Sequence, residues 1–428
     1  MSGQNVDVAV IGAGFAGLAA ALELQQSGVD FILLEARDRA GGRVEARRNG
    51  LGELIDTGGQ FLCEDMPELM ALVRRSGLTL VTTPVAGAFT VQPPMSGVAA
   101  ERSYAASMAI RDRMNLIDPK DPAIAGLSVA DWLARQDVSA DARSGFQSMI
   151  EGLWCQPIER IPLWYLIDND RRVTNEIPEL QYFVGETMQA LADRLASALG
   201  ERLRLSTAVT SVGTGSRGVR INCSGTVLHA RRALVAVPPV AARQIRFQPP
   251  LPDRLQQALD AWNSGTVIKG LVRYATPFWR TLGRNGMVMW RDIHGLFACD
   301  ASHDDGHPAL VVFIAGPLAE RWRGLGGERL AMEIRSRLAA ALGPEADQVL
   351  DITFRDWCGD RWSGGGYSDI IVDAATTDAE DVLREGAWPI LFTCSELSPS
   401  FPGYVEGAIV AGRAAARRLL DETSTTGR

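Results

Sequence analysis

Three glycines and one acid near the N-terminus carry the most informative chemistry in the sequence. Gly12, Gly14 and Gly17 have GxGxxG spacing directly after an apolar stretch, and Glu35 follows a second apolar stretch at residues 31–34. Glycines at this spacing allow a tight turn, close approach of backbone amides to a pyrophosphate and close helix–strand packing, while the acid binds a ribose hydroxyl. The start of the following helix also stabilises phosphate charge. The pattern predicts a bound adenine dinucleotide, because an ordinary glycine turn would leave Glu35 unexplained.

A lysine and two tyrosines, far apart in the chain, are further candidates for chemistry. Lys269 interrupts the apolar stretch TVIKGLVR, where an ammonium is costly to bury unless water or another group receives it. It could instead belong to an edge strand and point into solvent. Tyr367 lies in DWCGDRWSGGGYSD and Tyr404 in SFPGYVEGAI. As isolated residues, both tyrosines would be packing side chains.

A strand–helix–strand unit must position the N-terminal glycines. Residues 8–11 predict the first strand, 18–25 predict a helix that Gly28 ends, and 31–34 predict the second strand. Further on, GETMQALADRLASALG predicts an amphipathic helix that ends at Gly200, and RLRLSTAVTSV and GVRINCSGTVLHARRALVAVPP predict strands. The last segment, WPILFTCSELSPSFPGYVEGAIVAGRAAARRLL, predicts a strand, a loop and a helix.

This alternation of patterns predicts two interleaved domains. We expect a discontinuous nucleotide-binding domain of residues 1–83, 187–261 and 380–428, and a second domain of residues 84–186 and 262–379. The first part of the second domain is helix-like and contains several tryptophans and prolines. A chain of 428 residues with 46% hydrophobic content is long enough to bury two cores.

Composition excludes several classes of function. A net charge of −8 argues against nucleic acid or an anionic membrane as a partner. The six cysteines have no CxxC spacing, which suits a reducing compartment rather than a disulfide framework or a zinc site. Neither a secretory signal nor an apolar run of about 18 residues is present, and a polar tail follows the predicted helix at 408–420. We therefore expect a cytoplasmic protein without a membrane anchor.

The segments after Glu35 connect the chain to a known family. ARDRAGGRVEARR brings Gly41, Gly42 and Arg43 close behind the acid, and LIDTGGQFL adds Gly58 and Gly59. With these motifs the sequence resembles the flavin-dependent amine oxidases, which include monoamine oxidases, polyamine oxidases and bacterial nicotine-alkaloid oxidases. The resemblance covers essentially the whole chain. It implies an α/β fold in which a Rossmann-like FAD-binding domain of the glutathione-reductase type is interleaved with a mixed α+β substrate domain.

The resemblance also implies a set of FAD contacts. Arg43 and the backbone of Gly41 and Gly42 would approach the pyrophosphate and ribityl chain, and Gly58 and Gly59 would pass close to the flavin. The backbone of Val209 would hold the adenine end, and Glu396 would lie near the ribityl chain and pyrophosphate. The other expected contacts are neighbours of the matching motifs: Phe15, Ala16, Ala36, Arg37, Gln60, Trp357, Tyr404, Val405 and Ala408.

Two positions depart from the family's usual pattern. Gly366 stands where monoamine oxidases have the cysteine that is bonded to the flavin, while the following Tyr367 is kept. FAD is therefore expected to bind without a covalent link. Reading Cys358, eight residues earlier, as the flavin ligand would break the alignment. Cys394 occupies a place where the family usually has glycine, which leaves the local backbone path uncertain.

For catalysis, the resemblance assigns roles to three residues. Lys269 would hold a water against flavin N5, and Tyr367 and Tyr404 would form an aromatic pair that directs a neutral nitrogen and its α C–H towards N5. Two electron-rich ring faces would also attract a cationic amine. The helix after Tyr404 would aim its N-terminus at the flavin, where its dipole favours the reduced ring.

These observations predict FAD-dependent oxidation of an amine. A hydride equivalent would pass from the α-carbon to N5, the imine would hydrolyse, and oxygen or another acceptor would reoxidise the flavin, with oxygen giving peroxide. The alternatives are a flavin-dependent desaturase or dehydrogenase of a carbon skeleton, which does not need paired tyrosines, and a flavin-binding protein without turnover.

The sequence does not define the oligomeric state, and a homodimer is one of the assemblies that we consider. His303 and His307 lie in a predicted turn, and no metal is expected. We expect the pocket to be flanked by loops around Trp154, Trp164, Asp168 and Asp170.

Overall fold

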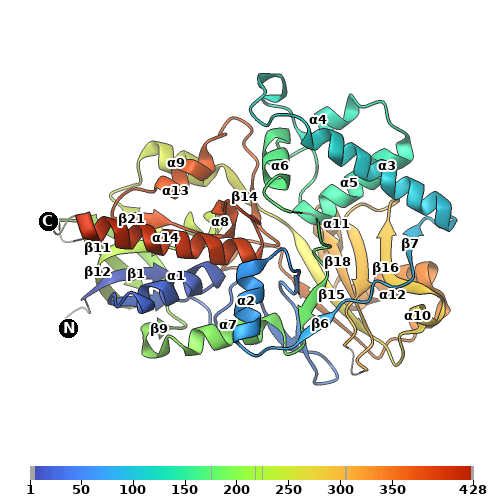
Figure 1. Ribbon diagram of the computed structural model, residues 1–428, viewed down its shortest axis with the longest axis horizontal. Coiled ribbons are helices and arrows are strands. Elements are labelled where there is room, and N and C mark those ends of the chain that lie inside the picture. The colour runs from blue at the N-terminus through green and yellow to red at the C-terminus, as the bar shows by residue number, and fades with distance from the viewer. Residues whose placement is uncertain (1–4, 175, 217, 224, 304–305, 426–428) are drawn as a thin grey trace.

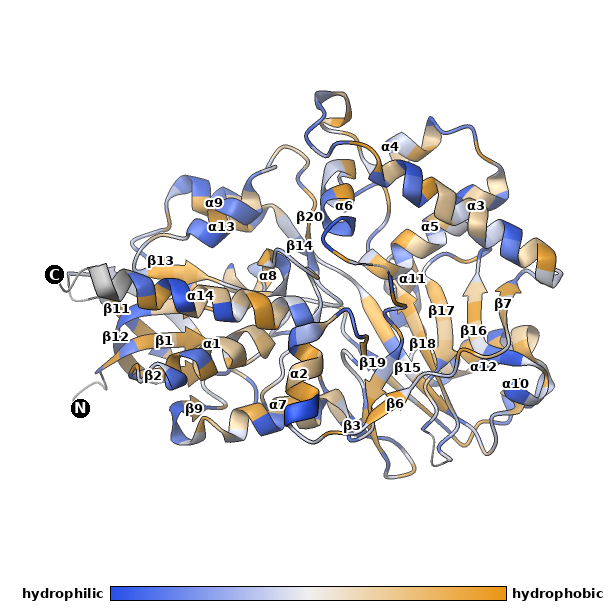
Figure 2. Ribbon diagram, viewed as in Figure 1, coloured by the Kyte–Doolittle hydropathy of each residue, from blue (hydrophilic) through white to orange (hydrophobic). Residues whose placement is uncertain are grey.

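The computed structural model describes residues 5–174, 176–216, 218–223, 225–303 and 306–425. Two β-sheets lie next to each other along the long axis of the molecule, each with helices packed against it (Figure 1). The strands of both sheets are mainly apolar, while hydrophilic residues gather on the outer sides of the helices (Figure 2). No helix within the described residues is both long enough and apolar enough to cross a membrane.

The first sheet contains the N-terminal strand at its centre. Its strands, in spatial order, are β13 (Arg246–Gln248), β10 (Val209–Gly215), β11 (Gly218–Cys223), β12 (Thr226–Val235), β1 (Asn5–Ile11), β2 (Phe31–Leu34) and β9 (Leu203–Arg204), with β21 (Ile390–Phe392) also paired to β12. β1 runs parallel to both β2 and β12, and Val10 is in register with Leu33 and Leu234. These strands come from 1–83, 187–261 and 380–428, and the predicted α/β class is confirmed.

Helix α1 (Phe15–Gln26) joins β1 to β2, as the glycine motif predicts. Its residues from Phe15 to Ala21 are all buried. One side of the helix packs near the sheet, and another side packs along α14 (Val405–Thr425). A Cβ atom on Gly412 of α14 would lie only 2.1 Å from the carbonyl oxygen of Ala16. The last helix therefore depends on glycine for its close approach to α1, and it begins three residues before the predicted start.

The second sheet is mainly antiparallel. Its strands, in spatial order, are β19 (Asp351–Asp356), β15 (Val267–Arg273), β18 (Ala309–Ala315), β17 (Leu296–Asp300), β16 (Arg284–Trp290) and β7 (Ala88–Gln92). β15 pairs with β18 on one side and β19 on the other, and each of its residues is buried. The interpretation of Lys269 as an edge-strand lysine is therefore wrong.

A group of helices covers one end of the second sheet (Figure 1). Its members are α3 (Gly97–Asn115), α4 (Val129–Ala134), α5 (Ala140–Trp154) and α6 (Leu163–Asp170). Ser96, Ser128 and Ser139 begin three of these helices, because each side chain accepts a hydrogen bond from a backbone amide of the first turn. The remaining helices near this sheet are α10 (Phe278–Thr281), α11 (Pro317–Trp322) and α12 (Gly327–Leu342).

Shorter elements connect the two sheets. The helices are α2 (Pro67–Arg75), α7 (Met188–Ser197), α8 (Pro239–Ala242), α9 (Asp253–Asp260) and α13 (Ala379–Glu385), and the strands are β3 (Ala46–Arg48), β4 (Leu54–Asp56), β5 (Phe61–Leu62), β6 (Leu80–Thr82), β8 (Tyr182–Val184), β14 (Trp262–Ser264) and β20 (Asp369–Ile371). Helix α7 ends before the predicted Gly200, which has a φ of +55° and opens a short 3-10 turn instead.

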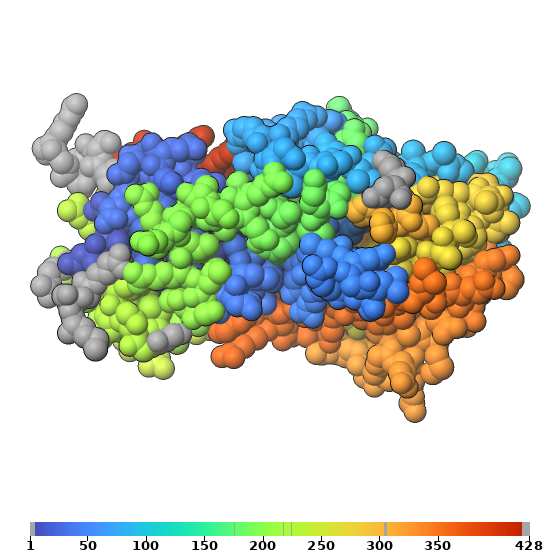
Figure 3. Space-filling view, turned by 90° about the horizontal axis from the view of Figure 1, so that it is seen from below, coloured from blue at the N-terminus to red at the C-terminus, as the bar shows by residue number. Residues whose placement is uncertain are grey.

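Pairing between distant segments interleaves the chain. β8, which follows α6, pairs with β5 and β6 from the first hundred residues. β14 likewise pairs with β20, which follows it about a hundred residues later in the sequence. On the face seen in Figure 3, segments from the beginning, the middle and the last third of the chain adjoin one another. The site therefore has to be assembled from segments that are remote in sequence.

Candidate active site

A cavity of about 880 Å³ contains almost all the predicted site residues and is lined by parts of both sheets. The predicted residues on its wall are Gly12, Gly14, Phe15, Ala16, Glu35, Ala36, Arg37, Gly41, Gly42, Arg43, Gly58, Gly59, Gln60, Val209, Lys269, Trp357, Tyr367, Tyr404, Val405 and Ala408. Two predicted residues, Gly17 and Glu396, lie behind this wall.

The glycine turn has the geometry that a pyrophosphate needs. Gly12 has a φ of +102°, and a Cβ atom there would lie 2.6 Å from Cγ1 of Val237. A Cβ atom on Gly17 would lie 1.9 Å from the carbonyl oxygen of Gly12, so Gly17 allows the helix to pack against the turn. At Gly14 a Cβ atom would meet only the Cα of Gly42, at 4.0 Å. The space in front of Gly14 and the first turn of α1 is therefore open to a phosphate group.

The carboxylate of Glu35 is buried and holds the glycine turn to the end of β2. It accepts hydrogen bonds from the backbone amides of Ala13 at 2.7 Å and Arg37 at 2.9 Å. Burial raises the pKa of Glu35, while these two amides act in the opposite direction. Each carboxylate oxygen has two lone pairs, so both can still accept a ribose hydroxyl. The residues at this end of the cavity thus fit an adenine dinucleotide.

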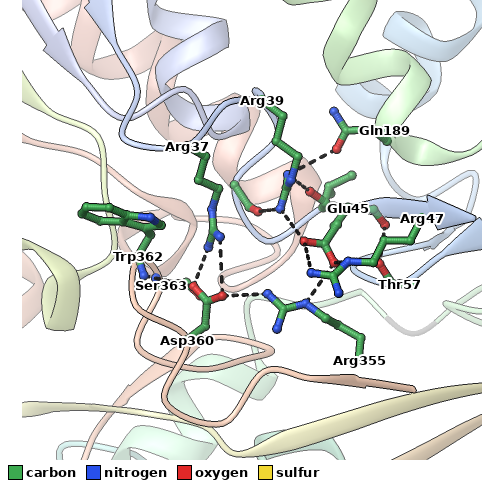
Figure 4. A network of polar contacts seen from close by, with 12 residues as sticks. Arg37, Arg39, Glu45, Arg47, Thr57, Gln189, Arg355, Asp360, Trp362 and Ser363 are labelled. Carbon is green, nitrogen blue, oxygen red and sulfur yellow. Dashed lines mark hydrogen bonds and ion pairs between the residues drawn. The ribbon is translucent and has the colours of Figure 1, made fainter. Parts of the chain in front are cut away.

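A network of ion pairs surrounds this end of the cavity and joins the two sheets (Figure 4). Arg37 pairs with Asp360 at 2.5 Å, Asp360 pairs with Arg355 of β19 at 2.7 Å, and Arg355 pairs with Glu45 at 2.9 Å. Glu45 also pairs with Arg39 at 3.1 Å. Burial alone would raise the pKa of Asp360, but hydrogen bonds from Arg37 and Arg355 keep it below its ordinary value. No local pattern indicates Asp360 as a partner of Arg37, because the two residues are 323 positions apart in the sequence.

Arg43 lines the cavity and binds protein groups on its far side. Its guanidinium pairs with Glu396 at 2.5 Å and donates to Ser395 Oγ at 2.9 Å and to the carbonyl oxygen of Tyr367 at 3.1 Å. Although burial acts to raise it, the charge of Arg43 lowers the pKa of Glu396 to about 2. Glu396 can therefore act on a ligand only through Arg43. Its neighbour Cys394 has a φ of −164°, an extended conformation that needs no glycine.

Lys269 lies in the middle of β15 and is 4% exposed. Its Nζ donates to the carbonyl oxygen of Gly58 and to Oε1 of Gln60, both at 2.8 Å. Burial lowers the pKa of Lys269, and the charge of Asp56 on β4 opposes this shift. An ammonium has three N–H donors, and protein groups use two. The third can hold the predicted water.

The two tyrosines reach the cavity from different loops. Tyr367 packs edge-on against Phe313 of β18, with ring centres 5.7 Å apart. Tyr404 precedes α14, and its hydroxyl donates to Oε2 of Glu179 at 2.5 Å. Burial raises the pKa of both phenols well above the ordinary value, so both remain neutral donors near pH 7.

Several residues on the cavity were missed from sequence. Glu179 carries a charge into the wall, and Arg111 of α3 binds Asp170 of α6 through two hydrogen bonds of 2.7 and 2.9 Å. The wall of the same cavity also has apolar residues, which are Met108, Met149, Met287, Met289, Leu296 and Phe297. The one signal in the sequence is the i, i+3 spacing of Met108 and Arg111, which places both residues on one face of a helix.

Of the four residues predicted to flank the pocket, Trp154 and Asp170 line it. Trp164 and Asp168 are not on its wall themselves; they belong to α6, a helix rather than a loop, whose Asn169 and Asp170 line the cavity. The indole of Trp164 is buried and donates to the carbonyl oxygen of Ala374 at 3.1 Å. Asp168 is 46% exposed and pairs with Arg172 one helical turn later.

The cysteines of the described structure are all free. Gly366 lines the cavity and has no side chain that could bond to a cofactor, whereas Cys358 is buried away from it. In the described residues, no cluster of three His, Cys, Asp or Glu side chains is arranged to hold a metal. His307, from the predicted turn, contacts Glu53 at 3.1 Å instead.

Comparisons with known proteins agree with this geometry. The sequence matches the family model described as flavin containing amine oxidoreductase over residues 15–107 and 143–420. Flavin-containing amine oxidase A of Bos taurus is 28% identical, and the alignment covers 98% of this chain and 86% of the bovine protein. A putrescine oxidase bound to putrescine superimposes with a TM-score of 0.90 at 26% identity, covering 97% of this chain and 99% of that one. Cyclohexylamine oxidase from Brevibacterium oxydans has a TM-score of 0.89 at 25% identity, covering 98% and 99%.

Proposed function

This chain belongs to the flavin-containing amine oxidoreductases and uses non-covalently bound FAD to oxidise an amine, and from that premise we propose which residues do the work. The observation that carries the proposal is the meeting of Lys269, Tyr367 and Tyr404 on one cavity, although they come from three separate segments. Family membership also favours amine oxidation over a carbon-skeleton desaturase or a flavin protein without turnover.

We assign the two ends of the cavity to the two ends of the cofactor. Gly14, the first turn of α1 and Glu35 would hold the pyrophosphate and ribose, and Val209 would hold the adenine. Gly58, Gly59 and Lys269 would lie at the flavin. Bound FAD supplies the acceptor for the hydride equivalent that leaves the α-carbon of the amine.

Three side chains would then act on the substrate and on a water. The rings of Tyr367 and Tyr404 orient the amine nitrogen, since their electron-rich faces attract a cationic amine. Lys269 holds a water with its remaining N–H, because Gly58 and Gln60 occupy the other two donors. Burial of this part of the cavity excludes bulk water and strengthens these contacts.

The test is a screen of amines against the holoprotein without oxygen, followed by admission of air. Benzylamine, cyclohexylamine and 1,4-diaminobutane cover aromatic, alicyclic and dicationic substrates. We expect at least one of them to bleach the flavin absorbance, and oxygen to restore it with formation of hydrogen peroxide. Flavin that stays oxidised with every amine would contradict the proposed residue roles, and bleaching that only a quinone reverses would contradict oxygen as the acceptor.

A further inference from the structure

Glu179 is an acid on the cavity wall that forms no ion pair with the described residues. It lies in the loop between α6 and β8 and is partly buried. One of its oxygens accepts the hydroxyl of Tyr404 at 2.5 Å, and the other accepts no hydrogen bond from the described residues. A phenol donates a hydrogen bond but carries no compensating charge.

The charged neighbours of Glu179 are already paired with each other. Arg111 gives two hydrogen bonds to Asp170, and Asn115 donates to the same carboxylate at 3.2 Å. Arg111 and Asp170 therefore form an ion pair with each other, and neither forms one with Glu179. Burial raises the pKa of Glu179; the hydrogen bond from Tyr404 and the charge of Arg111 oppose this shift, and the negative charge of Asp170 adds to it. A carboxylate in such surroundings is stabilised by any cation that can reach it.

The apolar part of the same cavity wall also restricts what that cation can be. Met108 lies one helical turn before Arg111 on α3, and Met149, Met287 and Met289 extend the apolar wall onto α5 and β16. Methionine side chains adapt to ligands of irregular shape. A cation that enters here must carry an apolar body, since a small hydrated ion would leave the methionines facing water.

We infer that Glu179 receives a positively charged nitrogen of the substrate and so selects amines that carry a cationic nitrogen on an apolar body. This inference rests on the proposed function, because it concerns the same cavity. Glu179 is a specificity-determining residue in this scheme. The hydrogen bond from Tyr404 fixes the direction of its carboxylate, and the methionine-lined wall takes the body of the amine.

The experiment compares two ligands of one shape that differ in charge. 2-Phenylpropan-2-amine is cationic at pH 7 and has no hydrogen on the carbon that bears nitrogen, so it binds without being oxidised, and 2-phenylpropan-2-ol is its neutral counterpart. Dissociation constants for both come from changes in the flavin absorbance of the holoenzyme. We expect the wild type to bind the amine about tenfold more tightly than the alcohol, or better, which corresponds to about 1.4 kcal/mol.

Glu179→Gln is the critical variant, because glutamine still accepts the hydroxyl of Tyr404 but has no charge. We expect its preference for the amine to fall to about twofold or less. Glu101→Gln removes the same charge from an exposed position of α3 that does not line the cavity, and it should keep the wild-type preference.

Three results would overturn the inference. One is a wild type that binds amine and alcohol equally, which can be measured whether or not the variants fold. Another is an undiminished preference in Glu179→Gln. The third is an equal loss in Glu101→Gln, which would indicate a general charge effect. None of these results bears on the proposed function, because bleaching of the flavin by an oxidisable amine such as benzylamine tests that separately.

Discussion

The two ends of the cavity are built in different ways. At the Gly14 end much of the wall is backbone, supplied largely by residues 11–44 with additions from 207–209 and 236–238, and held by glycines and by the carboxylate of Glu35. At the Tyr404 end the wall is mainly side chains, which come from α3, β15, β16 and the loops that carry Glu179 and Tyr367. At the Gly14 end, many backbone donors together bind the cofactor. At the Tyr404 end, each side chain has its own role in orienting the amine or holding the water. Substitutions at the first end should therefore change FAD affinity, and those at the second should change reaction rates.

Lys269→Met is the strongest test of the expectation that substitutions at the Tyr404 end of the cavity change reaction rates. We expect the purified variant to remain yellow, while flavin reduction by an amine, reoxidation by oxygen, or both slow by about a hundredfold or more, as happens when one preorganised donor is lost from an active site. Stopped-flow absorbance measures both steps. Lys120→Met, at an exposed lysine, is the matched control. A variant with wild-type rates would show that Lys269 only packs the sheet.

The pH profile sharpens the same test. Burial lowers the pKa of Lys269 to about 8, and the charge of Asp56 opposes this shift. Below that pH the ammonium is charged, so the part of the rate that depends on Lys269 should be lost as the pH rises through about 8. Asp56→Asn removes the opposing charge and should move the inflection to lower pH. The same inflection in Lys269→Met would assign it to another group, such as the substrate amine.

Glu35→Ala tests the expectation that substitutions at the Gly14 end of the cavity change FAD affinity. Losing a charged hydrogen bond to the ribose costs roughly 1.5–3 kcal/mol, so FAD should bind about ten- to a hundredfold more weakly. At saturating FAD the rate of flavin reduction should stay near that of the wild type. Equilibrium titration of apoprotein with FAD gives the affinity.

Glu35 also holds the amides of Ala13 and Arg37, so its loss loosens the turn as well as the ribose contact. Glu35→Gln separates these effects, because its side-chain oxygen still accepts one amide while the charge is gone. We expect an intermediate affinity for Glu35→Gln. Unchanged FAD affinity in both variants would count against the proposed cofactor pose.

The same contrast explains how much of the molecule could be predicted from sequence. The strand Phe31–Leu34 and the turn at Gly12 are as predicted, because short-range spacing and φ requirements determine them. The partner of Tyr404 lies 225 residues away in sequence, and no local pattern indicates that pairing. Lys269 could not be placed on an internal strand of its sheet either, since an apolar run with one lysine does not reveal its neighbouring strands.

The tyrosines should give smaller rate effects than Lys269. Tyr367→Leu and Tyr404→Leu each remove one ring face, and aromatic contacts to a desolvated amine amount to about 1–2 kcal/mol, or roughly five- to thirtyfold in rate. FAD affinity should change little. The effects should not add in the double variant, because both rings act on one nitrogen. Stopped-flow reduction of the three variants is the measurement, and strictly additive losses would mean that the rings do not share a task.

Asp360→Asn should have the smallest effect of these substitutions, and it should affect both FAD affinity and the rate of flavin reduction. Asp360 joins Arg37 at the FAD end to Arg355 of the second sheet, and it also accepts from the amide and hydroxyl of Ser363, four residues before Tyr367. Arg355 keeps its pair with Glu45, so the loss should be about 1 kcal/mol, or roughly fivefold. Because this carboxylate belongs to both ends, that loss should be divided between FAD affinity and reduction rate. A change confined to one of the two would show that the network in Figure 4 serves only that end of the cavity.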